Sequence, residues 1–300
     1  MSNRSETFNK LGRALERRLP ALVVSPLFAA SLFFVYGFIG WTAYVSLTKS
    51  GVMPNYHFDG LSQYARLWAT PRWYVAIRNL FIFSALFISV SMAIGILLAI
   101  LLDQRVRIEG VIRTIYLYPM ALSFIVTGTV WKWMLNPGLG LEKLMHQAGF
   151  ESFRFDWLIN SDFAIYTVVI AAVWQSSGYA MALFLAGLRS VDDEVLKAAA
   201  IDGAGPWLTY TGIVLPMLRP VFLSTVIILA HLAIKSFDLV VALTGGGPGY
   251  ATDMPATFMY SFAFQRSELG VAAASATMML MTVIAIIVPY LYSELRKTRG

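Results

Sequence analysis

Cysteine is absent from this 300-residue chain, and histidine occurs only three times. Without cysteine, the chain can form neither a disulfide framework nor a thiolate metal site. His57, His146 and His231 are scattered along the sequence and lack the spacing of a metal-binding motif. No nucleophile stands beside a candidate base either, so the sequence does not indicate an enzyme.

Charged residues are also scarce. They make up 13% of the chain, whereas hydrophobic residues make up 58%, and a soluble domain usually carries about a quarter charged residues. This deficit indicates a lipid environment. The apolar runs are continuous and do not alternate with polar residues, which favours spanning helices over barrel strands. We therefore predict an all-α integral membrane protein, because helix satisfies every backbone group within lipid.

Six apolar runs reach the roughly 20 residues that a helix needs to cross the hydrocarbon. These predicted spans lie near 21–47, 80–102, 110–134, 163–188, 220–244 and 271–292. The first run continues to Leu47, beyond the length of a signal-peptide core, which favours an uncleaved anchor. The sequence thus predicts a polar tail, a peripheral first helix, a core domain with one long internal loop, and a second tail. The first tail covers residues 1–20 and the peripheral helix covers 21–47. The core domain covers 80–292 and contains the long loop at 189–219, and the second tail covers 293–300.

Lysine and arginine are distributed unevenly around these spans. With the N-terminus inside, the predicted cytoplasmic segments hold 14 of the 23 lysines and arginines, and the outer segments hold seven. Lys132 and Lys235 lie within spans. Cytoplasmic loops carry the excess of positive charge in membrane proteins, so both termini are predicted to be cytoplasmic. The net charge of +6 is then a topology signal. No basic patch with interleaved aromatic residues suggests a nucleic-acid partner.

The longest predicted cytoplasmic loop contains an unusual stretch, KAAAIDGAGPWLTYTGIVLP, from Lys197 to Pro216. Its three alanines predict a short helix with a small-residue face. Gly203 can adopt the left-handed conformation that ends a helix, Asp202 can accept backbone amides of the following turn, and Pro206 can start the next segment. Two interpretations follow from the residues alone: a capped surface helix, or an element that docks another protein.

This stretch resembles the cytoplasmic signature of binding-protein-dependent ABC import permeases, E-A-A-x-x-x-G followed by I-x-L-P. The matching residues are Ala198, Ala199, Asp202, Gly203, Ala204, Ile213, Leu215 and Pro216. Trp131-Lys132-Trp133, Asn136-Pro137 and the run from Leu243 to Pro248 resemble the carbohydrate-uptake branch. The string from Ile234 to Thr244 looks closest to glucose/mannose-type permeases. The leading Glu of the signature is Lys197 here, and Glu194 lies one helical turn earlier.

The resemblance implies a subunit with six transmembrane helices and the type I importer permease fold, in a bacterial inner membrane. The chain would have no ATP site, because ATP and magnesium would bind to partner subunits. Those partners would be two ATP-binding cassette subunits, a second permease and a periplasmic sugar-binding protein, with membrane lipid around them. The residues that would couple to the ATPases are Glu194, Lys197, Ala198, Ala199, Asp202, Gly203 and Ala204.

A path for the sugar is predicted along the fourth and fifth spans, where the resemblance places the lining. His231, Lys235 and Asp238 are spaced four and three apart, which would put them on one face of a mid-membrane helix, with Ser236 on a neighbouring face. Ionisable groups at that depth usually face a cavity, although Lys235 and Asp238 could instead form a neutral structural pair. The fourth span adds aromatic and polar groups suited to a sugar, namely Trp174, Gln175, Ser176 and Tyr179.

Other functions compete with a sugar importer. A secondary transporter driven by an ion gradient would be expected to show paired helix interruptions or an acidic proton relay, and the sequence shows neither. A channel or structural membrane protein would explain the spans but not the cytoplasmic signature. A permease for another small polar solute, such as glycerol phosphate, stays open.

Overall fold

Helices make up most of the described part of the chain. The computed structural model describes the backbone of residues 2–104 and 107–297, and the side chains of residues 23–104, 107–289 and 292. Within those residues, β structure is limited to one isolated bridge between Thr48 and Phe58. The prediction of an all-α protein is therefore confirmed.

Among the residues that the structure describes, four helices are long and apolar enough to cross a membrane alone. They are α1 (Ser2–Val45, apolar from Val23), α3 (Pro71–Asp103), α7 (Ala164–Leu188) and α14 (Leu269–Lys297, apolar to Pro289). They correspond to the first, second, fourth and sixth predicted spans. Helix α3 begins before the predicted residue 80, because Pro71 at its first position fits a helix start.

The third predicted span is bent. Helix α4 (Glu109–Leu117) continues into a 3-10 turn, η1 (Tyr118–Ala121), and then turns by 100° into α5 (Phe124–Met134). Ser123 has extended backbone, and its hydroxyl caps α5 by accepting the amide of Ile125 at 3.3 Å. The prediction of one continuous helix over 110–134 is therefore wrong, because this serine starts a new helix.

The fifth predicted span is broken as well. Helix α11 (Arg219–Ile234) ends before Lys235, and α12 (Asp238–Leu243) begins after a three-residue gap. A tight turn closes there, with the amide of Phe237 donating to the carbonyl of Lys235 at 2.8 Å. Before α11, the segments α9 (Pro206–Thr209), η2 (Tyr210–Val214) and α10 (Leu215–Met217) meet it at 65°. The expectation of uninterrupted spans, which weighed against a secondary transporter, is thus also wrong.

Small residues bring the central helices close together. A Cβ atom added to Gly95 of α3 would lie 2.6 Å from the Ala180 Cβ of α7, and one added to Gly128 of α5 would lie 2.7 Å from the Ala242 Cβ of α12. Small residues at crossing points let helix backbones pack tightly within a membrane. An apolar core around Phe83, Phe87 and Val168 packs α3 and α7 together with buried residues of α11 and α12.

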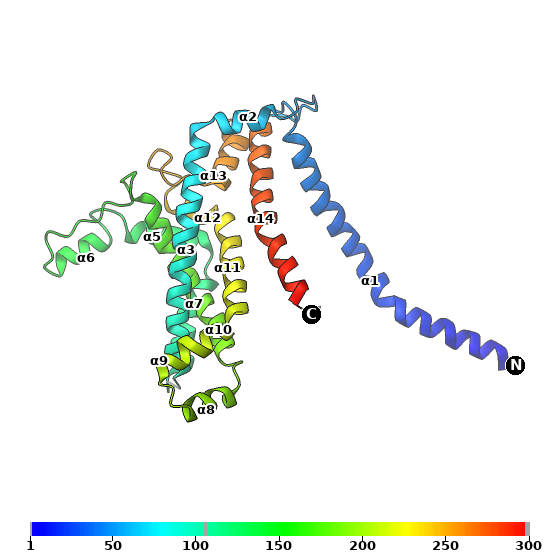
Figure 1. Cartoon of the computed structure of the whole chain (residues 1–300). Helices are drawn as coiled ribbons and strands as arrows, with labels where there is room; N and C mark the ends of the chain where they lie inside the picture. Colours follow the sequence, from blue (N-terminus) through cyan, green and yellow to red (C-terminus); the bar gives the residue numbers. More distant parts are fainter. Residues whose placement is uncertain (1, 105–106, 298–300) are drawn as a thin grey trace.

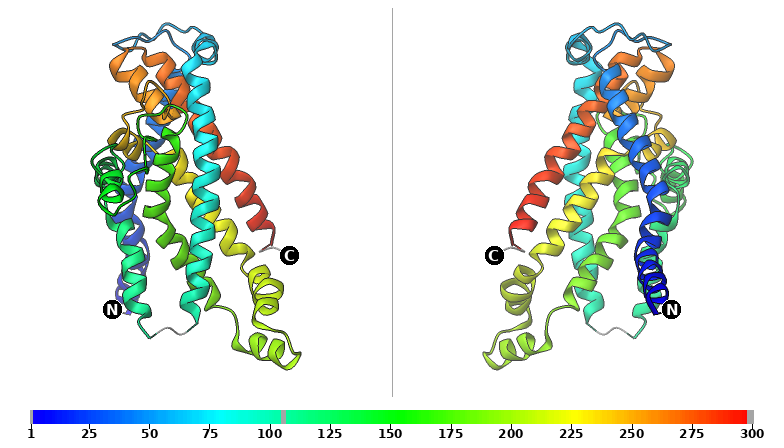
Figure 2. Two further views of the ribbon diagram at one scale, coloured as in Figure 1. Left: turned by 90° about the vertical axis from the view of Figure 1, so that its left-hand side faces the viewer. Right: turned by 90° about the vertical axis from the view of Figure 1, so that its right-hand side faces the viewer.

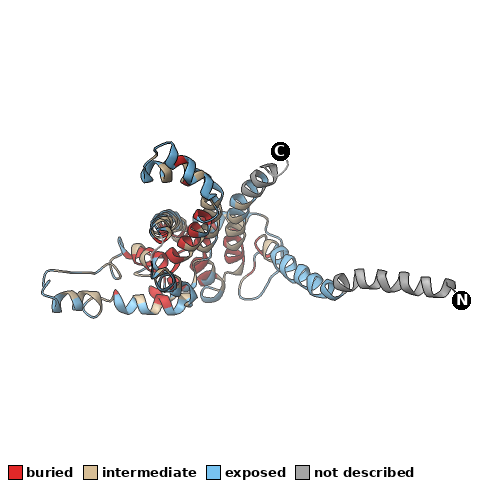
Figure 3. Cartoon of the chain, turned by 90° about the horizontal axis from the view of Figure 1, so that it is seen from below, coloured by how far each residue is buried: buried red, intermediate tan, exposed pale blue. Residues whose placement is uncertain are grey.

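The two ends of the molecule differ in structure (Figure 2). Helices α2 (Ser62–Ala69) and α13 (Pro255–Tyr260), with the π-helical turn η3 (Ser261–Gln265), lie at one end, and α8 (Asp193–Ile201) lies at the other. Helices α1 and α14 lie close together near α2, and both run from there toward the end of the molecule that carries α8 (Figure 1). Residues 23–41 of α1 are all exposed, as are most of those on α6 (Leu141–Gln147), whereas the buried residues gather in the middle (Figure 3). Apolar surface of that extent on α1 fits contact with lipid or another protein chain.

Candidate coupling loop and solute cavity

Helix α8 starts with a side-chain cap. Asp192 has extended backbone, and its Oδ1 accepts the amide of Glu194 at 2.9 Å. Asp193 and Glu194 place two further carboxylates in the first turn, where the helix dipole favours negative charge. Asp192 was not predicted as a cap from the sequence, although an aspartate directly before an acidic first turn is a recognisable capping signal.

The end of α8 is closed by backbone alone. Gly203 has φ +77°, its amide donates to the carbonyl of Ala200 at 3.2 Å, and the amide of Ala204 donates to the carbonyl of Ala199 at 2.9 Å. These two bonds form a Schellman motif, which requires the left-handed residue that the sequence predicted at Gly203. The predicted role of Asp202 is wrong. Asp202 is the C-cap residue of α8, and within the described residues its carboxylate accepts no backbone amide of the turn.

The surface of α8 is apolar toward its C-terminal end. Ala199 is buried, whereas Glu194, Lys197 and Ala198 are exposed. Ile201, the last residue of α8, is 85% exposed. In α9, which follows, Trp207 is 81% exposed and Leu208 is 60% exposed. Exposed apolar groups gathered at a projecting helix indicate a binding surface for another protein. Sequence reasoning emphasised the alanines and missed these bulkier residues.

One ion pair joins the base of this loop to α4. A guanidinium nitrogen of Arg189 lies 2.8 Å from Oε2 of Glu109. The hydrogen bond that Arg189 donates to this carboxylate raises the pKa of Arg189 above its ordinary value, so the guanidinium stays charged. Exposed pairs of this kind contribute little stability.

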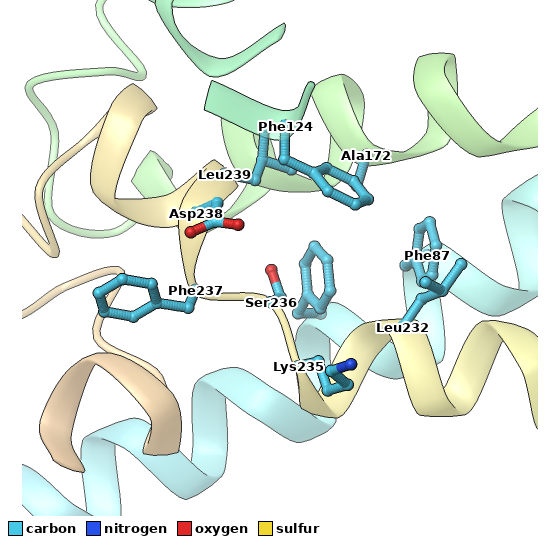
Figure 4. A pocket seen from close by; sticks show the side chains of 10 residues that line it. Phe87, Phe124, Ala172, Leu232, Lys235, Ser236, Phe237, Asp238 and Leu239 are labelled. Atoms are coloured by element: carbon cyan, nitrogen blue, oxygen red, sulfur yellow. The ribbon is translucent and has the colours of Figure 1, made fainter. Parts of the chain in front are cut away.

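A cavity of about 190 Å³ lies at the break between α11 and α12. Phenylalanine rings form much of its wall, and Lys235, Ser236 and Asp238 supply its polar groups (Figure 4). The hydroxyl of Ser236 lies between the other two side chains, and Phe237 points away from them (Figure 4). The remaining lining residues are Phe83, Phe87, Phe124, Ala172, Leu232, Phe237 and Leu239.

The predicted helix face of His231, Lys235 and Asp238 does not exist. The helix ends at Ile234, so Asp238 starts a separate helix. His231 instead borders a small gap lined by isoleucines of α11 and by residues of α14. Within the described part of the chain, Lys235 and Asp238 form no ion pair with each other. Both side chains are exposed, so the alternative of a neutral structural pair is not supported.

The predicted residues of α7 lie away from this cavity, which α7 lines with Ala172. Trp174 is 40% exposed, packs edge-on against Trp131, and lines a wide apolar groove with Tyr166 and Val173. Ser176 is buried, and Tyr179 is half-buried. The fourth and fifth spans therefore do not present one shared set of polar groups.

Gln175 is buried and serves the bend of the third span. Its Nε2 donates to the carbonyl of Leu122 at 2.8 Å, directly before Ser123. Its Oε1 is buried and has no hydrogen-bond partner among the residues that the structure describes. The fixed amide therefore satisfies a carbonyl that the broken helix leaves open.

Comparison with known proteins decides the family. Residues 91–297 match the family described as binding-protein-dependent transport system inner membrane component. The chain belongs to this family.

The permease has relatives along nearly its whole length. It is 40% identical to a probable ABC transporter permease protein of Pyrococcus horikoshii, over 91% of this chain and 92% of that one. It is 36% identical to a xylose/arabinose import permease protein of Haloferax volcanii, over 88% of this chain and 84% of that one. It is 31% identical to an sn-glycerol-3-phosphate transport system permease protein of Yersinia pseudotuberculosis, over 94% and 96%.

A solved structure supports the permease fold. The bacterial alginate ABC transporter, in complex with alginate pentasaccharide-bound periplasmic protein, contains a chain that matches with a TM-score of 0.82 at 19% identity. The match covers 97% of this chain and 99% of that one. The predicted type I importer permease fold is confirmed, and the described helices provide four spans, or six if each of the two bent pairs of helices counts as one span. The relatives differ in their solutes, so the glucose/mannose prediction stays a prediction.

Replacing Gln175 of the permease with alanine is expected to destabilise the protein, because the carbonyl of Leu122 loses its donor. A buried carbonyl without a partner costs about 1–3 kcal/mol, and because Leu122 is only partly buried, the lower part of this range is expected. Thermal unfolding of the purified protein in detergent measures the loss. Ser176→Ala is the matched control, since Ser176 is buried one residue away and its hydroxyl has no hydrogen bond within the described residues. An unchanged melting temperature with impaired uptake would instead assign Gln175 to the solute path.

Proposed function

We propose that this permease moves a sugar, of the glucose or mannose type, inward through an ATP-driven importer that receives it from a periplasmic binding protein. The observation that carries the proposal is the geometry of α8. In a chain of this family, a capped helix that projects from one end, exposes Ile201 and is followed by the exposed Trp207 of α9 suits docking to an ATPase.

The proposed coupling needs no chemistry on this chain. ATP and magnesium would bind to two cassette subunits that hold α8 in a groove. Closure of those subunits on ATP would displace α8 and rotate the helices between inward-facing and outward-facing states. Ala198 has a small side chain on the exposed surface of α8, which lets a partner approach closely.

The proposed orientation follows from the ends of the molecule. The end with α8 would be cytoplasmic, and α1 and α14 point toward it, which would place both termini there (Figure 2). The opposite end, with α2, α13 and the exposed side chain of Tyr250, would then face the binding protein. A second permease would complete the path and could cover the exposed apolar surface of α1, with lipid around the rest.

The cavity at the break in the fifth span suits a neutral sugar. The rings of Phe87 and Phe124 provide apolar faces for C–H groups, and Ser236 can both donate and accept hydrogen bonds. Lys235 and Asp238 carry opposite charges, so an uncharged solute with many hydroxyls can use both. An anionic solute would gain from Lys235 but would be repelled by Asp238. Glycerol phosphate is the second candidate, because one relative is a permease for sn-glycerol-3-phosphate.

Reconstitution tests the proposal. The permease would be purified with its cassette subunits, second permease and binding protein, and uptake into liposomes measured with ATP inside and with ion gradients collapsed. We expect ATP-dependent uptake of glucose or mannose, and little uptake of xylose, maltose or glycerol phosphate. Uptake that needs an ion gradient but not ATP would contradict an ABC importer. ATP-driven uptake of glycerol phosphate alone would contradict the sugar assignment.

A further inference from the structure

Helix α8 stands away from the helix bundle (Figure 1). A cavity of about 280 Å³ lies between it and the ends of α3 and α7. Ala200 and Ala204 border the cavity on the side of the loop, and Asp103 and Leu188 border it on the side of the bundle. Direct packing therefore provides little connection between α8 and the spans, and a displacement of α8 must reach them along the chain that follows it.

Tyr210 is the first residue after α8 that hydrogen-bonds α3, within the part of the chain that the structure describes. Its hydroxyl donates to Oδ2 of Asp103, the last residue of α3, at 3.0 Å. The same hydroxyl accepts from Nε2 of Gln104 at 3.1 Å. Both hydrogen-bonding functions of the phenol are thus satisfied by adjacent residues at the end of one helix.

The position of Tyr210 along its own segment makes this contact directional. Tyr210 begins the π-helical turn η2, which directly follows α9. Farther along, Val214 and Leu218 pack into the apolar core with Leu102 and Leu188. Apolar packing is non-directional, whereas a hydrogen bond requires a particular distance and angle between donor and acceptor. The hydroxyl therefore fixes how the start of η2 is rotated relative to α3.

Helix α3 links this contact to the proposed sugar cavity. It extends without interruption from Pro71 to Asp103. Phe83 and Phe87 of the same helix line the cavity at the α11–α12 break. The close approach of Gly95 to Ala180 holds α3 against α7 between these two points. A shift of the Asp103 end is therefore passed on as movement of a rigid helix.

We propose that the hydrogen bond between Tyr210 and Asp103 couples α8 to α3, so that displacement of α8 by an ATPase moves the wall of the solute cavity. Tyr210 and Asp103 are positioning residues in this scheme and do not contact the solute. The inference rests on the proposed function as an ATP-driven importer. The other polar connection of this loop, Arg189 to Glu109, leads to α4, which does not line that cavity.

The test compares transport with ATP hydrolysis in the complete importer. Tyr210→Phe keeps the ring and removes only the hydroxyl, so Asp103 loses its donor. Uptake and ATP hydrolysis would be measured in the same liposomes. We expect the number of ATP molecules hydrolysed per solute transported to rise about tenfold, consistent with the loss of a hydrogen bond to a charged group. Asp103→Ala should raise the ratio similarly, and the double variant should add little, because the same interaction is already lost.

Tyr118→Phe is the matched control. Tyr118 is 64% exposed, and its hydroxyl has no hydrogen bond within the described part of the chain, so its loss should leave the ratio unchanged. A parent complex without ATP-dependent uptake would refute the proposed function itself. A transporting parent with an unchanged ratio in Tyr210→Phe would overturn the coupling role. Equal falls in uptake and hydrolysis, or loss of the assembled complex, would also overturn it, because they indicate a structural role.

Discussion

Replacing Gly203 with valine is expected to abolish ATP-driven uptake. Gly203 has φ +77°, and a side chain in the left-handed region costs about 1–2 kcal/mol, with β-branched residues tolerated least. If the backbone moves to avoid this cost, the bonds from the amides of Gly203 and Ala204 to α8 are lost. Helix α8 then no longer presents Ile201 at a fixed angle to the neighbouring subunit. Uptake into liposomes and copurification of the cassette subunits measure the effect.

Gly205→Val is the matched control for this prediction. Gly205 has φ −67° and ψ 162°, which is the extended conformation that a residue before proline prefers. No atom lies within 4 Å of a Cβ built at this position. The same side chain two residues farther along should therefore leave uptake near that of the parent. If both valine variants transport normally, the turn at Gly203 is not needed for coupling.

The sequence was sufficient for the features that depend on local chemistry. Continuous apolar runs predicted six spans, and α7 ends at Leu188 as expected. The left-handed conformation of Gly203 and the helix start at Pro206 were also predicted correctly. In each case a single residue type makes one backbone conformation far cheaper than the others, so no knowledge of the neighbouring helices is needed.

The breaks within spans were not predictable in the same way. Residues 220–244 were predicted as one spanning helix with polar residues at helical spacing, yet the chain turns at Ser236. The glycines at the crossing points show why. Gly128 brings the backbone of α5 against α12, and this tertiary contact offsets the local preference for a continuous helix. The prediction that His231 and Asp238 share one helix face assumed a continuous helix. It failed because the helix ends at Ile234.

Buried polar partners were missed for a related reason. Gln175 was assigned to the sugar path because its type suits hydroxyl groups, but its amide reaches the carbonyl of Leu122, 53 residues away. Which partner a polar side chain finds depends on packing between distant segments. Exposure was equally hidden, because the sequence alone does not show that the side chain of Trp207 is 81% exposed.

Replacing Asp253 with alanine is expected to be strongly destabilising. Asp253 is buried, and its Oδ2 accepts from Nε of Arg72 at 2.6 Å. The hydroxyl of Thr257 also donates to this carboxylate, at 2.6 Å. The guanidinium of Arg72 lies 4.3 Å from the centre of the Tyr250 ring. The side-chain amide of Asn79 donates a hydrogen bond to the backbone carbonyl of Asp253 at 2.9 Å. Arg72 is thereby attached to the loop that joins α12 to α13.

The size of the effect follows from what the substitution leaves behind. The side chain of Arg72 is only 13% exposed, so without Asp253 its charge stays within the protein and has lost its carboxylate partner. Removing one member of a buried ion pair costs about 3–5 kcal/mol. A marked fall in the melting temperature is therefore expected, and increased proteolysis of the loop at 244–254 should accompany it.

Glu268→Ala provides the comparison within the same end of the molecule. Glu268 pairs with Arg66, but their side chains are 33% and 54% exposed. Water solvates either charge when the other is removed, so the loss should stay below about 1 kcal/mol. Similar melting temperatures for the Asp253 and Glu268 variants would mean that water reaches Arg72 as readily as Arg66. The attachment of the loop to α3 would then have to rest on Asn79, whose amide bonds both Ala251 and Asp253.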